Sequence, residues 1–183
     1  MRRKNVTSEM MKEYIVGALL CLMKSRRFSD ITIGEITNKA GVNRSTYYRN
    51  FNSKEEIISL YFSHILDQSI DGICNKKDIE LKEYLIHVFS CFYEHKEALL
   101  CIHRNGLSYL FLTTLNTYFE QQREVEKRKF TDEIPLYYHT GGIFNDFILW
   151  FDFNMEPAPE VFANAAASIG PANKRPVLLQ GRA

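Results

Sequence analysis

The chain has 183 residues, of which 45% are hydrophobic and 25% are charged. This is enough apolar material for a buried core in one large or two small domains, and it excludes a disordered chain. The net charge is only +1 but is unevenly spread: residues 1–60 hold 11 Lys and Arg against 6 Asp and Glu, and residues 61–183 hold 12 against 16. A basic first third and an acidic remainder favour a nucleic-acid contact confined to the first third.

Membrane and secreted classes are not favoured. The longest run without a charged residue, residues 105–119, has 15 residues, of which six are Asn, Ser or Thr; a spanning helix needs roughly 20 apolar residues. The apolar stretch 14–23 follows Glu9 and Glu13 and has no small-residue cleavage site, so it predicts a helix rather than a signal peptide. The four cysteines form no C-x-x-C pair, which indicates reduced thiols in a cytoplasmic protein.

The first 72 residues predict four helices in a compact head. Apolar spacings of three and four predict a helix over residues 8–25, preceded by a flexible basic arm, Arg2, Arg3 and Lys4, suited to a minor groove. Thr32 and Glu35 have the spacing of a capping box, and Gly41 suits a left-handed turn that ends this second helix. Asn43 is placed to cap a third helix over residues 44–50. A second capping box over residues 53–56 opens a long fourth helix.

The remainder also has helical periodicity. We expect helices over residues 79–95, from 96 to at least 102, and over 108–129, 137–153 and 159–168. Strand-like alternation is not visible, so the predicted fold class is all-α, a three-helix DNA-binding head followed by a larger helical domain. The predicted domains are residues 1–52 for the head and 53–169 for the second domain, with 53–72 as the connecting helix. A disordered tail is expected at 170–183.

Two short helices joined by a turn that contains glycine describe a helix-turn-helix, whose second helix normally enters the DNA major groove. On a helical wheel Tyr47 and Phe51 point toward the core, whereas Ser45 and Arg49 point away. Arg, Asn and Thr side chains read base edges, and hydroxyls and Lys hold phosphates. The alternative is a small helical bundle with a solvated basic face. The polar chemistry of this helix favours DNA binding.

Residues 31–56, ITIGEITNKAGVNRSTYYRNFNSKEE, resemble the DNA-binding signature of the tetracycline-repressor (TetR/AcrR) family. The resemblance implies a homodimeric, all-helical transcription factor that binds a palindromic operator. The positions matching the family's DNA contacts are Thr32, Arg44, Ser45, Thr46, Tyr48, Arg49, Asn50 and Lys54. The positions matching the helix-turn-helix core are Ala40, Gly41, Val42, Tyr47 and Phe51. Thr37 and Gly34 depart slightly from the family pattern.

The same resemblance implies a dimer interface and an effector pocket in the second domain. Residues 137–144, Trp150 and residues 159–160 are similar to the family's last two helices, which predicts an interface containing Gly141, Gly142, Phe144 and Trp150. An apolar or aromatic small-molecule effector is expected among Phe89, Phe92, Tyr93, Tyr109, Phe111 and Tyr118. The alternative for these aromatic residues is that they fill a helical core.

The predicted function is therefore a cytoplasmic homodimeric repressor that binds double-stranded DNA, has no membrane partner and no cofactor, and is released by an effector. One alternative is an activator or coactivator with the same fold and no inducer. Another is a metal sensor using His87, Cys91 and His95, with Cys101 and His103 nearby, although such residues are ordinary at the boundary of an apolar helix face. Enzymatic activity is not expected, because the sequence indicates no Ser-His-acid grouping, phosphate loop or paired carboxylates.

Overall fold

The computed structural model describes residues 2–71, 73, 79–121 and 130–169, and all regular secondary structure in these ranges is helical. The elements are α1 (Arg2–Met23), the 3₁₀ turn η1 (Phe28–Asp30), α2 (Ile33–Ala40), α3 (Arg44–Asn50), α4 (Lys54–Asp71), α5 (Leu81–Tyr93), α6 (Lys96–Arg104), α7 (Tyr109–Gln121), α8 (Phe130–Asp152) and α9 (Pro159–Ile169). The predicted all-α class is confirmed. None of the described helices combines the length and apolar character needed to cross a bilayer.

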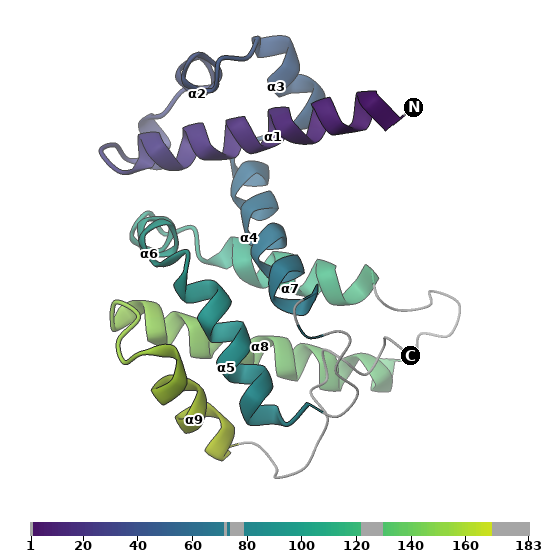
Figure 1. Ribbon diagram of the computed structural model, residues 1–183, viewed down its shortest axis with the longest axis vertical. Helices are drawn as coiled ribbons and strands as arrows, with labels where there is room; N and C mark the ends of the chain where they lie inside the picture. The colour runs from purple at the N-terminus through teal and green to yellow at the C-terminus, as the bar shows by residue number, and fades with distance from the viewer. Residues whose placement is uncertain (1, 72, 74–78, 122–129, 170–183) are drawn as a thin grey trace.

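Helices α1, α2 and α3 with η1 form the head at one end of the molecule, and α4 runs from the head into the body formed by α5–α9 (Figure 1). In the head, α1 packs against α2, α3 and α4. Ile15 and Leu19 of α1, Ile36 of α2 and Tyr47 of α3 have no exposed surface, so they form the common core of the head.

The body is built around α4, which packs against α5 and α7, while α9 lies along α5 (Figure 1). Rings from α5, α7 and α8 fill its centre. The ring centroid of Phe92 lies 4.4 Å from that of Phe147 and 5.3 Å from that of Phe111. The buried Trp150 stacks on Phe162 of α9 with centroids 5.4 Å apart. This continuous aromatic core holds the body helices together.

The head is joined to the body by polar contacts in addition to α4. The backbone N–H of Phe28 in η1 donates to Asn105 Oδ1, just after α6, over 2.9 Å. His64 Nδ1 of α4 lies 2.9 Å from Glu13 Oε1 of α1. These contacts connect the head to α4 and α6 independently of the peptide chain between them.

Several predicted helix signals are confirmed at atomic level. Thr32 Oγ1 accepts from the Glu35 backbone N–H and the Glu35 carboxylate accepts from the Thr32 N–H, so the capping box is complete. Gly41 has φ +68° and ends α2 as expected. The second capping box is altered: the Glu56 N–H donates to Ser53 Oγ, but the Glu56 carboxylate accepts from the Asn52 N–H instead of that of Ser53.

Two helix starts and one cap differ from prediction. Helix α1 begins at Arg2, so Arg2, Arg3 and Lys4 belong to a helix and the predicted flexible arm is wrong. Helix α8 begins at Phe130, earlier than the predicted start at residue 137, and continues through Pro135, which lies inside the helix. Asn43 occupies the N-cap position of α3 but its side chain makes no capping hydrogen bond. Residues 122–129 of one predicted helix and the tail 170–183 lie outside the described residues.

Candidate nucleic-acid interface

Helix α3 is anchored on one side and open on the other. Tyr47 is fully buried and Phe51, just after the helix, is nearly so, with ring centroids 5.9 Å apart. On the opposite side Arg44, Ser45, Tyr48 and Arg49 are exposed, and Tyr48 keeps 62% of its surface accessible. The two buried aromatic side chains fix the rotation of the helix about its axis. The opposite face, which carries guanidinium, hydroxyl and phenol groups, is therefore exposed to solvent. This is the side-chain chemistry that reads base edges and holds phosphates.

The side chain of Arg44 lies across the start of α2. A β-carbon built on Gly34 would lie 2.5 Å from Arg44 Nη2, so the glycine leaves the space that the guanidinium occupies. This contact is with the far end of a flexible, exposed side chain, so a larger residue at position 34 would displace the Arg44 guanidinium from this place. The nearby departure Thr37 is also accommodated, because the buried Thr37 hydroxyl donates to Gly34 O over 3.1 Å.

Thr32, a predicted phosphate contact, is exposed at the N-terminus of α2 but is already hydrogen-bonded. Its N–H and its hydroxyl both donate to Glu35 Oε2, at 2.9 Å and 2.8 Å. Arg26 donates to the other Glu35 oxygen. These hydrogen bonds, led by that from the Thr32 backbone, lower the pKa of Glu35 from 4.5 to about 2. A phosphate at this helix end would therefore share its donors with a carboxylate that stays ionised.

Glu35 gives the head a specific response to acid. Because its folded-state pKa lies below its usual value, its contribution to the free energy of unfolding is complete above about pH 4.5 and is lost as the pH falls toward about 2. We expect the stability difference between wild type and Glu35→Gln to shrink over this window in denaturant titrations. Glu97→Gln, the same change at an exposed carboxylate in the first turn of α6, is the matched control. A pH dependence for Glu35→Gln no larger than that of this control would contradict the assignment.

Two other predicted DNA contacts, Asn50 and Lys54, are tied into the head. The Asn50 side chain donates to Thr46 O over 2.7 Å and accepts from Ser8 Oγ of α1 over 3.0 Å. Lys54 Nζ donates to Phe28 O and Ile31 O, both at 2.7 Å, and lies 4.6 Å from the centroid of the Phe28 ring. Their first role in the free protein is to hold α3 and η1 in place. Thr46 is half-buried.

The predicted core of the motif lies where expected. Tyr47 and Phe51 are buried, and Ala40 and Val42 are half-buried against the core cluster. The buried Tyr47 hydroxyl has no hydrogen-bond partner among the described residues, and burial raises its pKa.

The aromatic residues predicted to line an effector pocket separate into different environments. Phe89, Phe92, Phe111 and Tyr118 are buried, and the three phenylalanines pack directly on the rings of the core. Tyr109 is 53% exposed at the start of α7. Ring-to-ring packing at these distances favours the alternative interpretation, in which most of these side chains fill the core.

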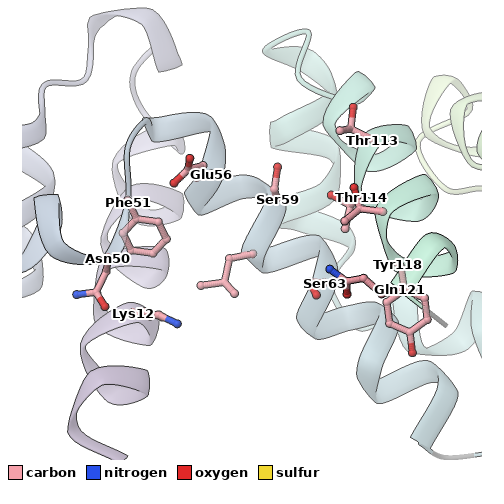
Figure 2. Close-up of a pocket in the computed structure, with 12 residues that line it drawn as sticks. Lys12, Asn50, Phe51, Glu56, Ser59, Ser63, Thr113, Thr114, Tyr118 and Gln121 are labelled. Atoms are coloured by element: carbon pink, nitrogen blue, oxygen red, sulfur yellow. The ribbon is translucent and has the colours of Figure 1, made fainter. Parts of the chain in front are cut away.

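A cleft of about 400 Å³ lies between the head and the body, beside α4 (Figure 2). Figure 2 shows Lys12, Asn50 and Phe51 from the head on one side, Thr113, Thr114, Tyr118 and Gln121 of α7 on the other, and Ser59 and Ser63 of α4 between them. Sequence reasoning missed this site because its residues come from four separate segments. Of the predicted effector residues, Tyr118 lines this cleft and Tyr93 lines a second one between α1 and the start of α6.

The predicted dimer residues do not share one environment. Gly142 is exposed, Gly141 and Phe144 are half-buried, and Trp150 is fully buried within the protomer. Trp150 therefore lies beneath the exposed surface of α8 and is not part of that surface. Large exposed apolar side chains of this region are Phe130, Ile134, Tyr137, Tyr138, Leu149, Phe153, Val161 and Ile169.

The predicted metal-binding set does not converge. His87 Nε2 lies 3.6 Å from Cys91 Sγ, but His95 bonds Tyr61 and Cys101 donates to Met23 O. Within the described residues no three His, Cys, Asp or Glu side chains are arranged to hold a metal ion. The metal-sensor alternative is therefore not supported.

The structure does bring a serine, a histidine and an acid together, contrary to the sequence prediction. His103 lies 2.9 Å from Ser108 Oγ through Nδ1 and 3.0 Å from Asp152 Oδ1 through Nε2. Ser108 is buried at the start of α7. The three residues link the ends of α6 and α8 to the start of α7.

Comparison with known proteins agrees with this geometry. Residues 15–60, from α1 to the first turns of α4, match the family described as bacterial regulatory proteins, tetR family. No curated protein sequence matches the chain. Two solved structures share the fold: the dihydroxyacetone kinase operon activator DhaS, with 14% identity over 87% of this chain and 93% of that one (TM-score 0.51), and Thermus thermophilus FadR, a TetR family transcriptional repressor in complex with lauroyl-CoA, with 21% identity over 93% and 94% (TM-score 0.52).

The family match covers the helices that present Arg44, Ser45, Tyr48 and Arg49 on one open face, and the larger helical body follows as in the similar structures. Residues 15–60 of the chain therefore match the tetR family of bacterial regulatory proteins, and the chain as a whole shares the fold of the two solved structures.

Proposed function

We propose that this protein is a DNA-binding transcriptional regulator, a cytoplasmic homodimer that represses transcription by occupying a palindromic operator. One α3 helix from each protomer would enter successive major grooves, roughly 34–36 Å apart. The observation that carries the proposal is the anchoring of α3 by Tyr47 and Phe51, which leaves Arg49 and its neighbours on one exposed polar face. The proposed dimer is supported by the exposed apolar side chains of α8 and α9, since monomers rarely expose so many together.

Arg49→Ala should weaken binding to the operator by about 1–3 kcal/mol, which is about 5- to 150-fold in dissociation constant. The reason is the loss of a guanidinium that can contact a guanine bidentately. The operator is first selected from random duplexes with the wild-type protein, and affinity is then measured by fluorescence anisotropy. Lys82→Ala, which removes an exposed charge from α5 in the body, is the control. Equal affinity of Arg49→Ala and wild type would remove Arg49 from the base-reading set.

Repression is distinguished from activation by transcription reconstituted in vitro on the regulator's own promoter. The two similar folds named above include one activator and one repressor, and the same DNA-binding act serves both roles. Repression predicts an operator that overlaps the promoter core and transcription that falls as the regulator is added. Stimulated transcription from an upstream operator would favour an activator, and absence of salt-dependent DNA affinity would favour a coactivator.

We place the effector in the cleft between the head and the body rather than among the core aromatics. A molecule touching Lys12 and Asn50 on one side and Gln121 on the other would couple its binding to the orientation of the head. Hydroxyl, amide and charged groups line the cleft together with Phe51, Leu60 and Tyr118, which favours a small molecule with both apolar and polar parts. A compound that releases operator DNA from wild type but not from Ser63→Phe, whose added ring fills the cleft, would locate the effector here. Release from both proteins would place it elsewhere.

A further inference from the structure

Asp146 is an isolated charge on α8. It is the only Asp, Glu, Lys or Arg between Ile134 and Phe151. The side chain is half-buried, and it makes no hydrogen bond or ion pair with another described residue. Burial raises the pKa of its carboxyl group. A carboxylate that loses water without gaining a partner is unfavourable, so the protomer alone leaves this side chain incompletely accommodated.

Asp146 belongs to a regular line of residues along one side of α8. Successive spacings of four and three connect Pro135, His139, Gly142, Asp146, Leu149 and Phe153, the last of these just beyond the helix. This alternation keeps the six residues, called the seam below, on one side of the helix, where a second helix can pack. Asp146 is half-buried and the other five are exposed, and Leu149 and Phe153 retain 52% and 64% of their surface. The seam is therefore a side of α8 that is uncovered in the protomer.

Gly142 lies at the centre of this seam. A β-carbon built on Gly142 would meet no atom within 4 Å, so the glycine leaves a gap at the surface of α8. Glycine at such a point permits two helix backbones to approach closely. His139 precedes Gly142 by three residues and Asp146 follows it by four. An antiparallel crossing of two α8 helices, about a two-fold axis midway between positions 142 and 143, therefore brings position 139 of each copy opposite position 146 of the other.

Helices α8 and α9 together contain only one basic side chain that could pair with the Asp146 carboxylate. Neither helix contains a Lys or an Arg, and His139 is their only histidine. His139 is exposed. Whichever of these two helices a second copy presents to Asp146, the imidazole is the only basic side chain that can donate to it.

We propose that a second copy of this chain packs antiparallel along the α8 seam, and that Asp146 accepts a hydrogen bond from the partner's His139, with the reciprocal bond across the two-fold axis. This inference rests on the proposed homodimer and adds the position of its axis and the contact that fixes its register. In an otherwise apolar face, such a polar pair selects one register because any shift leaves both groups buried and unpaired.

A reciprocal exchange of the two residues tests the pairing. Asp146→His places two imidazoles in apposition and His139→Asp places two carboxylates in apposition, so each single variant should raise the dimer dissociation constant by about tenfold or more. The double variant restores both pairs in exchanged positions and should return to within about threefold of wild type. Sedimentation equilibrium measures the dissociation constants, and circular dichroism checks that each variant is folded. A double variant as weak as the single variants would overturn the inference.

A crosslink tests the axis without disturbing the pair. In a Cys21→Ser, Cys74→Ser background, which removes the one exposed thiol among the described residues and the cysteine that lies outside them, Gly142→Cys should form an intersubunit disulfide on mild oxidation. Asn145→Cys, exposed on α8 but off the seam, is the matched control and should crosslink far less. A wild-type protein that remains monomeric at all concentrations would overturn the proposed dimer and this inference together. A dimer that neither responds to the exchange nor crosslinks at position 142 would overturn the inference alone.

Discussion

Replacing the sole tryptophan, Trp150→Ala, should lower the free energy of unfolding by about 3–5 kcal/mol. Trp150 is fully buried, with its ring stacked against Tyr93 and Phe162 at centroid distances of 5.8 Å and 5.4 Å. It also meets Phe89 edge-on at 5.2 Å. These rings belong to α5 and α9, so truncation opens a cavity where three helices meet. Losses of this size are a large fraction of the stability of an ordinary domain.

The measurement and its controls follow from the same contacts. Urea unfolding is followed by circular dichroism, because the variant has lost the only tryptophan available for fluorescence. Trp150→Phe keeps a ring but removes the Nε1–H that donates to Pro157 O over 2.9 Å, so it should cost less than Trp150→Ala. Tyr109→Ala removes an aromatic ring that is 53% exposed on α7 and should cost about 1 kcal/mol or less. Similar losses for Trp150→Ala and Tyr109→Ala would contradict the packing described here.

Features that depend on neighbours along the chain were predictable from the sequence. The Thr32–Glu35 capping box, the left-handed Gly41 and the inward side of α3 each involve residues within a few positions of one another. Helix geometry alone then fixes which groups meet. The same reasoning correctly placed Tyr47 and Phe51 in the core.

Contacts between distant segments were not predictable. The hydrogen bond from Phe28 N–H to Asn105 spans 77 positions, and a backbone donor leaves no side-chain signature in the sequence. The aromatic residues of the body fit equally well with a pocket and with a core. Only the ring-to-ring distances of Phe89, Phe92 and Phe111 distinguish the two. Composition identifies which side chains are available, whereas packing decides whether space remains between them.

Lys54, in the candidate DNA interface, also has contacts with distant segments that the sequence does not reveal. By position it matches a DNA contact, and its charge suits a phosphate. Its actual partners are the backbone carbonyls of Phe28 and Ile31, 26 and 23 positions earlier, which no side-chain pattern reveals. Two of its three N–H donors are used in this way, and the ammonium group also lies over the Phe28 ring.

Lys54→Met should therefore lower the free energy of unfolding by about 2–3 kcal/mol, since the methionine keeps much of the aliphatic stem but loses two charge-assisted hydrogen bonds. Lys24→Met, the same change at an exposed lysine after α1, should have an effect within about 0.5 kcal/mol. Thermal and urea unfolding measure both.

The salt dependence of operator binding then separates the two roles of Lys54. A lysine that contacts phosphate contributes about one unit to the slope of log affinity against log salt concentration, because it releases a condensed counterion. If Lys54 acts by holding η1 between α1 and α2, Lys54→Met weakens operator binding and lowers stability while the slope stays unchanged. A slope reduced by about one unit with unchanged stability would instead assign Lys54 to the DNA backbone. Because its ammonium group retains one donor beyond those bound to Phe28 and Ile31, a loss in both measurements would mean that the same side chain orders the head and meets the phosphate.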